Sequence, residues 1–335
     1  MVALPRLGRR RIFFGALAGT FVLAAVYFLA RNLSGAMHTL GERSAAELML
    51  LLPATALMTV AVVSHGLNWT AIVSRLQKGS SFDWRLFRFF LVSWPGRYVP
   101  GTMPYHAARI MMAERFGTTK RTVTASIAYE AVLQAGGAAV VGVVCVTFAL
   151  GMSQSASSIY VVALLPLAGL PVALQPRFLT PVANRLLRVA RRQPLTADAL
   201  LGGRETLVSF AGYAALHTLN GLAFYLVLIA VTDVSISPLL AIGAFNLAGC
   251  VGVAVLFVPS GLGIREAVIV AIIGATTAPE AALLAAGTTR AISIVADLVP
   301  LLSVVLYGAV ARMRWGSRTA QPGHLGLEEE QRKAA

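Results

Sequence analysis

An apolar stretch long enough to cross a membrane, Leu239–Val258, runs into the turn-forming segment Pro259–Gly263 and is followed by a second apolar run. Backbone that stops being helical at membrane depth has unpaired N–H and C=O groups, so it is tolerated only inside protein or beside a wet cavity. A similar break, Trp94–Gly101, lies in the first half of the chain. Interrupted apolar segments at matching places in two halves indicate a transporter-type binding site.

The overall composition is that of a membrane protein. The 335 residues are 57% hydrophobic and 13% charged, and the formal net charge of +14 comes from basic residues that lie between the apolar runs. This distribution is typical of the positive-inside pattern and not of a nucleic-acid-binding face. We therefore predict an all-α polytopic membrane protein, with lipid as its partner and no contact with nucleic acid.

The number of membrane crossings follows from the apolar segments, at about 20 residues per crossing. Six segments are long enough: Ile12–Ala30, Leu48–Val73, Thr122–Leu150, Ile159–Leu174, Leu207–Val231 and Ala281–Ala311. Basic clusters lie on one side of these spans, whereas the other side has only Arg31 and Arg43. The asymmetry predicts that both termini are cytoplasmic, residues 1–11 as a short N-terminus and residues 316–335 as a solvated tail.

Two further segments are predicted to enter and leave the membrane on the same side. Segment 86–115 has basic flanks at both ends. Its arms, Leu86–Trp94 and Pro104–Met112, would rise only about 14 Å each at 1.5 Å per residue, which is half of the hydrocarbon core. Segment 239–276 is expected to enter from the opposite side, because only then do the basic residues after the last span stay in the cytoplasm.

These re-entrant helical hairpins divide the chain into two halves of opposite orientation. Residues 12–150 contain two spans, the hairpin 86–115 and one span, and residues 159–311 repeat this order with the hairpin 239–276. An odd number of crossings in the first half forces the second half to be upside down. The expected architecture is therefore an inverted repeat of about six transmembrane helices and two re-entrant hairpins.

The hairpin tips predict an anion-binding site. Helices that begin at Pro104 and Ile264 would direct unpaired N–H groups into the protein, where they attract a phosphate. Glycine near each tip permits close approach and positive φ. The alternative is that the Gly and Pro residues only form tight turns. The candidate substrate ligands are Arg97, Pro100, Gly101, Arg109, Pro259, Gly261, Gly263, Arg265, Glu266 and Arg290.

Charged residues within the apolar segments strengthen this prediction. A charge at mid-membrane costs about 2.5–3.5 kcal/mol, so such residues usually face a bundle interior. Arg109 and Arg290 suit phosphate because a guanidinium binds it with two parallel hydrogen bonds, although structural ion pairs or snorkelling remain the alternative. Glu130 and Asp297 are candidate charge partners, as counter-ions or proton carriers. Arg290 and Asp297 share one helical face, two turns apart, and are not expected to touch.

Nothing in the sequence predicts catalysis. We find no nucleotide-binding glycine loop, no paired metal ligands and no nucleophile with a base. We therefore expect no cofactor, no metal and no enzymatic activity. The tryptophans Trp69, Trp84 and Trp94 are interpreted as interface anchors and not as part of a cofactor site.

The motifs around the breaks resemble those of a known family. Phe257–Ala267, followed by Arg290 and Asp297, resembles the C-terminal signature of the lysylphosphatidylglycerol synthase transmembrane region, a flippase-like family. Tyr98–Gly101, followed by Arg109, resembles its N-terminal signature, and together the matches cover most of residues 10–315.

The chain departs from the family pattern at both motifs. The family's common Pro-Gly-Gly-hydrophobic-Gly is Pro259-Ser260-Gly261-Leu262-Gly263 here, which keeps the turn. Met103-Pro104-Tyr105-His106 stands where the first motif usually has a Gly and an acidic residue. Substrate handling near Arg109 is therefore expected to differ from that of better-known members.

The resemblance implies paired re-entrant helices and lipid translocation. The family's synthase activity belongs to a separate soluble domain, for which no residues remain here, so the membrane part alone is expected. The leading hypothesis is a flippase-like protein of a bacterial inner (plasma) membrane that carries an anionic phospholipid or a polyprenyl-phosphate lipid. The alternative is a non-transporting accessory subunit of an envelope glycosyltransferase or lipid-modifying enzyme, for which Arg109→Ala and Arg290→Ala would leave function intact.

Overall fold

The computed structural model describes residues 43–77, 80–98, 103–151, 200–254 and 263–319, with positions 181, 184, 185 and 188. These residues form helices and connecting turns, with no strand among them. Four helical stretches are long and apolar enough to cross a membrane: Ala45–Leu76, Lys120–Gly151, Gly203–Val231 and Pro279–Tyr307. They coincide with four of the predicted spans. The predicted spans Ile12–Ala30 and Ile159–Leu174 lie outside the described residues, so the total of six stays a prediction.

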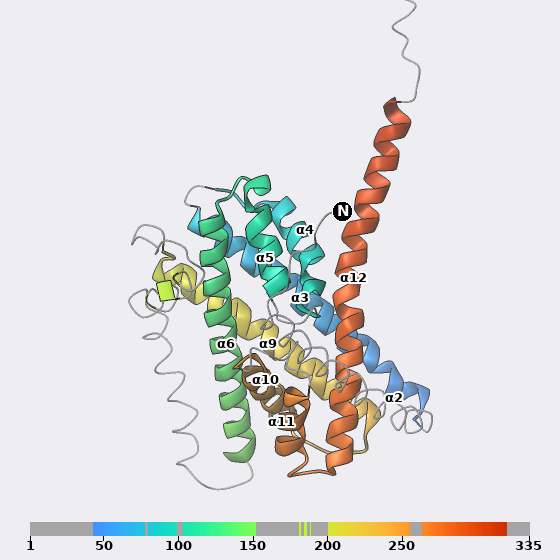
Figure 1. Cartoon of the computed structure of the whole chain (residues 1–335). Helices are drawn as coiled ribbons and strands as arrows, with labels where there is room; N and C mark the ends of the chain where they lie inside the picture. Colours follow the sequence, from blue (N-terminus) through green and yellow to red (C-terminus); the bar gives the residue numbers. More distant parts are fainter. Residues whose placement is uncertain are drawn as a thin grey trace, which may run out of the picture.

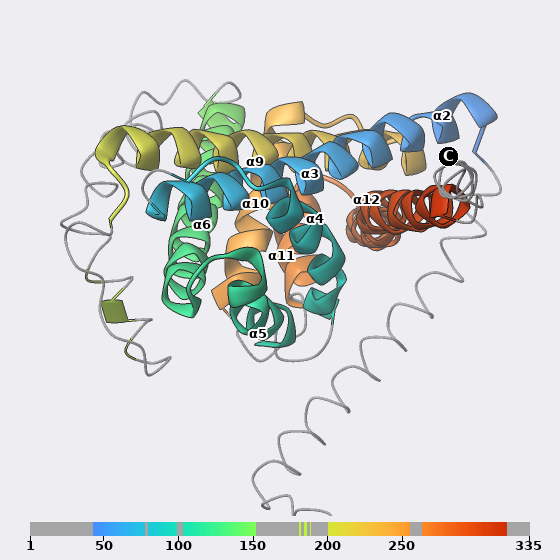
Figure 2. The same cartoon turned by 90° about the horizontal axis from the view of Figure 1, so that it is seen from above.

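Helices α3 (Leu51–Leu76) and α9 (Gly203–Val231) lie side by side along one side of the molecule (Figure 1 and Figure 2). A Cβ atom added at Gly212 of α9 would lie 2.8 Å from Nδ2 of Asn68 on α3. The same Nδ2 donates a hydrogen bond of 2.8 Å to the Ser209 carbonyl oxygen. Small residues and interhelical hydrogen bonds are the usual means of packing helices in membranes, because lipid provides no hydrophobic drive between them.

Helices α6 (Lys120–Gly151) and α10 (Pro238–Ala254) approach backbone to backbone. A Cβ atom on Gly243 would lie 2.5 Å from Val146 Cγ2 and 2.8 Å from the Val146 backbone nitrogen. On the other side of the contact, a Cβ atom on Gly142 would lie 2.8 Å from Leu247. The two glycines therefore allow an approach that no larger residue would permit.

Two pairs of shorter helices pack against these long ones. The first helical pair consists of α4 (Trp84–Ser93) with the 3-10 turn η1 (Trp94–Tyr98), and of α5 (Met103–Met112). The second helical pair consists of α10 and α11 (Ile264–Ile273). Helix α11 begins at Ile264, as the sequence predicts, and the arms of the first pair agree with prediction within two residues. Positions 99–102 and 255–262, which include part of the first expected tip and most of the second, lie outside the described residues, and re-entry into a membrane stays a prediction.

Helix α12 (Pro279–Thr319) packs against both helical pairs and against the long helices α3 and α9. It contacts α3, α4, η1, α9 and α11. Its 41 residues correspond to about 62 Å, well beyond the predicted span Ala281–Ala311 and past Gly316, where the solvated tail was expected to begin. The two remaining described elements are short: α2 (Ala45–Met49), which precedes α3, and the 3-10 turn η2 (Ala113–Phe116), which follows α5.

Local sequence explains where several helices start. Ser44 and Glu47 form a reciprocal cap at α2: the Glu47 backbone N–H donates to Ser44 Oγ at 3.3 Å, and the Ser44 N–H donates to Glu47 Oε2 at 2.8 Å. At α4 the Arg85 N–H donates to Asp83 Oδ1 at 2.8 Å. Gly263, which precedes α11, has φ of +81°, a conformation that side-chain-bearing residues rarely adopt.

Candidate functional site

Charged side chains are buried where the two helical pairs meet α3, α6 and α12. Arg109, Glu130, Asp297, Glu266 and Arg290 are all at most 8% exposed. Each of them belongs to the set that the sequence predicts to face the interior. They fall into three groups, built around Glu130, Asp297 and Glu266.

The first group joins α5 to α3 and α6. Arg109 Nη1 lies 2.7 Å from Glu130 Oε2, and His65 Nε2 lies 2.7 Å from Glu130 Oε1. The Tyr105 hydroxyl donates to the same Oε1 at 3.3 Å. These four residues belong to three helices: His65 to α3, Glu130 to α6, and Tyr105 and Arg109 to α5. The carboxylate of Glu130 therefore holds the first helical pair against the long helices.

The guanidinium of Arg109 is also enclosed by aromatic rings. Its central carbon lies 4.5 Å from the ring centre of Trp69 and 4.2 Å from those of Phe90 and Tyr105. The electron-rich faces of such rings stabilise a cation that has lost its water. Arg109 is only 1% exposed, so in this conformation its partners are Glu130 and the rings.

The second group joins η1 to α12. Asp297 Oδ1 accepts a hydrogen bond of 2.9 Å from Trp94 Nε1, and Oδ2 accepts one from the Tyr98 hydroxyl at 2.5 Å. Arg97 Nη2 lies 3.0 Å from the same Oδ2. The carboxylate of Asp297 thus contacts three residues of η1, the turn that forms the described part of the first predicted break.

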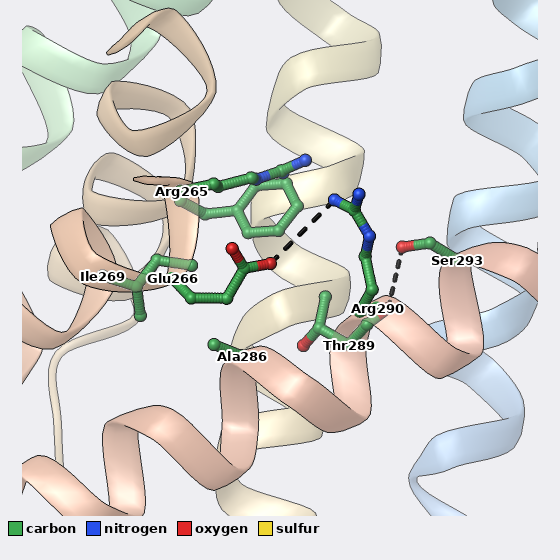
Figure 3. A pocket seen from close by; sticks show the side chains of 8 residues that line it. Arg265, Glu266, Ile269, Ala286, Thr289, Arg290 and Ser293 are labelled. Carbon is green, nitrogen blue, oxygen red and sulfur yellow. Dashed lines mark hydrogen bonds and ion pairs between the residues drawn. The ribbon is translucent and has the colours of Figure 1, made fainter. Parts of the chain in front are cut away.

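The third group forms a small pocket between α10, α11 and α12 (Figure 3). Arg290 Nη1 points across this pocket toward Glu266 Oε1, at 3.9 Å. The other carboxylate oxygen of Glu266 accepts a 2.7 Å hydrogen bond from the Gly263 N–H. Glu266 therefore occupies one of the N–H groups at the start of α11 that the sequence predicts to be available to an anion. We call this the arginine pocket; its lining is Phe245, Arg265, Glu266, Ile269, Ala286, Thr289, Arg290 and Ser293.

Arg265 gives the arginine pocket an excess of positive charge. Its guanidinium carbon lies 3.9 Å from the ring centre of Phe245, and within the described part of the chain no carboxylate lies at ion-pair distance from it. Thr289 and Ser293 donate their hydroxyl hydrogens to backbone carbonyls of their own helix, at 2.7 Å each. The pocket thus combines two guanidinium groups with one carboxylate.

The predicted site residues are distributed over these groups. Gly263, Arg265, Glu266 and Arg290 come together at the arginine pocket. Arg290 and Asp297 pair with different partners, as expected from their spacing. The other candidates are divided: Arg97 lies at the second group and Arg109 at the first, whereas Pro100, Gly101, Pro259 and Gly261 lie outside the described residues.

Sequence reasoning missed or misread several aromatic and histidine side chains. Trp69 and Trp94 are 0% and 5% exposed, so their interpretation as interface anchors was wrong; both lie against buried charges. Trp84, at 59% exposed, does lie at the surface. His65 was not singled out, although a lone histidine within the apolar segment Leu48–Val73 was a signal that an internal partner exists.

Long apolar helices with charges buried among them define an integral, multi-pass helical membrane protein. The family model described as the lysylphosphatidylglycerol synthase TM region matches residues 13–300, so the chain belongs to this family. The resemblance in the two motifs is thereby confirmed. A comparison with curated proteins found no match.

Proposed function

We propose that this protein moves an anionic lipid, a phospholipid or a polyprenyl-phosphate-linked intermediate, between the leaflets of a bacterial inner membrane. The headgroup would occupy the arginine pocket while the hydrocarbon tails stay in the bilayer. The observation that carries the proposal is that Arg265 and Arg290 lie around a single carboxylate in the lining of one buried pocket. Membership of the family supports the link to lipids.

The charges of the arginine pocket favour an anion. Keeping a guanidinium inside a membrane protein costs about 2.5–3.5 kcal/mol unless it is compensated. Within the pocket, Arg265 lies against the face of Phe245, and Arg290 faces the Glu266 carboxylate at 3.9 Å. A phosphate offers each guanidinium two oxygen acceptors in its own plane, so it would improve on both contacts.

Glu266 has a defined part in this arrangement. Its Oε2 is held by the Gly263 N–H, so the carboxylate stays in place if Arg290 turns toward a ligand. Arg265, which neighbours Glu266, would then keep its position relative to the phosphate of the bound headgroup, and so would the start of α11 at Gly263. We assign Arg109, Glu130 and Asp297 a positioning role, because their contacts hold the first helical pair against α3, α6 and α12.

Lipid exchange in vesicles tests the proposal. The purified full chain would be reconstituted with fluorescent phosphatidylglycerol, phosphatidylcholine or a polyprenyl phosphate, and transfer between leaflets measured by quenching of the outer leaflet. We expect protein-dependent exchange of an anionic lipid that falls about tenfold in Arg265→Gln and Arg290→Gln, since each removes a charge-assisted contact.

The matched control is Arg204→Gln, which removes an exposed arginine at the start of α9. Its exchange rate should equal that of the unchanged protein. Absence of protein-dependent exchange for every anionic lipid tested would refute transport and favour the accessory-subunit alternative. If Arg204→Gln, Arg265→Gln and Arg290→Gln exchange lipid at equal rates, the headgroup does not bind in the arginine pocket.

A further inference from the structure

A second, larger hollow lies further along α12 toward its C-terminal end, between α3, α4 and α12. We call it the α3–α4–α12 groove; its volume of about 390 Å³ falls within the usual range for sites that bind small molecules. Val63, Phe87, Leu91 and Val304 line its apolar walls. None of the residues that line the arginine pocket contributes to it.

The hydroxyl groups of Thr59 and Ser303 in the groove walls are already satisfied. Thr59 Oγ1 donates to the Thr55 carbonyl oxygen at 2.9 Å, and Ser303 Oγ donates to the Val299 carbonyl oxygen at 2.9 Å. Water inside the groove would therefore find few hydrogen-bond partners. A hydrocarbon chain needs no such partners, so it would lose no hydrogen bond there. The walls are suited to an acyl chain.

One part of the groove is cationic and aromatic. The guanidinium of Arg88 lies over the Tyr307 ring at 4.9 Å, and Trp84 and Tyr307 are 59% and 60% exposed. Tryptophan and tyrosine with an exposed face are typical of the level of lipid headgroups. Among the described residues no carboxylate pairs with Arg88, whereas its neighbour Arg85 pairs with Asp83 at 3.2 Å.

We infer that the α3–α4–α12 groove binds one acyl chain of an anionic phospholipid and that Arg88 holds the phosphate of that lipid. The occupant follows from the combination of apolar walls, an exposed guanidinium with no carboxylate partner among the described residues, and flanking interfacial aromatics. Along α12, Tyr307 lies 17 residues from Arg290, about 25 Å at 1.5 Å per residue. The bound lipid is therefore distinct from one in the arginine pocket, at another depth in the bilayer.

Photolabelling of the full chain tests this site. The protein would be reconstituted in vesicles that contain phosphatidylglycerol or phosphatidylcholine, each with a diazirine in one acyl chain and at equal mole fractions. Labelled residues would be mapped by mass spectrometry. We expect adducts on groove residues such as Leu91 and Val304, about fivefold more with phosphatidylglycerol, the difference that one arginine at a membrane surface supplies.

Two variants and one control make the outcome decisive. Arg88→Gln should remove the preference for phosphatidylglycerol, and Val63→Trp should reduce labelling of the groove by both lipids because the indole fills it. Arg115→Gln, an exposed arginine at the end of the first helical pair, should change neither. A preference that survives in Arg88→Gln, equal labelling by the two lipids, or no labelling of the groove would overturn the inference. If the groove is labelled but the protein exchanges no lipid, the labelling supports this site, and the missing exchange counts only against the proposed function.

Discussion

Asp297 and Trp94 are separated by 203 positions in the chain and are joined by a 2.9 Å hydrogen bond from the indole N–H to the carboxylate. The contact connects the last described helix with the turn of the first helical pair. The same carboxylate also receives the Tyr98 hydroxyl and lies 3.0 Å from Arg97. Because all of these groups converge on one residue, Asp297 determines how η1 lies against α12.

Asp297→Asn should loosen this junction. The amide keeps the size of the carboxylate, yet it removes the negative charge that lies 3.0 Å from Arg97 and provides only one acceptor oxygen for three donors. We expect the free energy of unfolding to fall by about 1–3 kcal/mol, the cost of leaving a buried polar group unsatisfied. Detergent-induced unfolding of the purified protein measures it. Tyr98→Phe, which removes only the hydroxyl that donates to the same carboxylate, should cost less, and a larger loss in Tyr98→Phe than in Asp297→Asn would contradict the central role of the carboxylate.

The Arg109–Glu130 pair predicts strongly coupled substitutions. Arg109→Met or Glu130→Leu alone leaves a buried charge without its partner, which should cost about 3–5 kcal/mol of unfolding free energy. The double variant removes both charges and should be less destabilised than the sum of the two. Unfolding of all three variants, compared as a double-mutant cycle, measures the coupling.

The same variants separate a positioning role from lipid contact at Arg109. If Arg109 only holds α5 in place, lipid exchange should fall in proportion to lost stability and recover in the double variant. Normal stability together with lost exchange in Arg109→Met would instead show that Arg109 contacts the lipid, as the sequence alone suggested.

Much of the fold could be predicted because membranes impose simple constraints. Apolar segments such as Thr122–Leu150 and Leu207–Val231 are long enough to cross and contain few charges, so their helices were evident before any contact was known. The start of α11 at Ile264 was equally evident, because glycine and proline end the preceding helix.

The partners within the site could not be predicted, because they depend on long-range packing. Nothing local connects Asp297 with Arg97 or His65 with Glu130, since each pair joins helices whose relative position the sequence does not encode in a short pattern. The same reason explains the error at Trp69. Its interpretation as an interface anchor could not take into account that α5 places Arg109 against the face of its indole. Conversely, the buried charges themselves were predictable, because their cost in lipid requires an interior location.

Gly263→Ala should destabilise the protein although there is room for the methyl group. No atom lies within 4 Å of the added Cβ, so the cost comes from the backbone φ of +81° alone. A residue held in such a conformation costs about 1–3 kcal/mol. Gly287→Ala in α12 is the matched control: its Cβ also meets nothing within 4 Å, and its helical position should gain about 0.5–1 kcal/mol. Melting temperatures of the two variants that shift in the same direction would be evidence against strain at Gly263.

Gly243→Ala should separate α6 from α10. Its Cβ would meet Val146 at 2.5 Å, and because the backbone nitrogen is also close at 2.8 Å, a change of side-chain rotamer is no remedy. Overpacking of this kind costs about 1–3 kcal/mol. Gly249→Ala, on the same helix with open space around its Cβ, should leave the melting temperature unchanged or raise it. Equal melting temperatures for the two variants would mean that α6 and α10 lie farther apart than the structure places them.

The inverted arrangement predicts opposite sides for two exposed loop residues, Ser80 before α4 and Ala278 before α12. Ser80 follows the basic segment that should be cytoplasmic, whereas α12 should start outside so that the arginines after it stay in the cytoplasm. In a background with Cys145 and Cys250 replaced by alanine, Ala278→Cys should react with a membrane-impermeant maleimide in intact bacterial cells. Ser80→Cys should react only after the membrane is opened. Reaction of both on the same side would mean that the second helical pair, α10 and α11, crosses the membrane instead of returning, and the two halves of the chain would not be inverted copies.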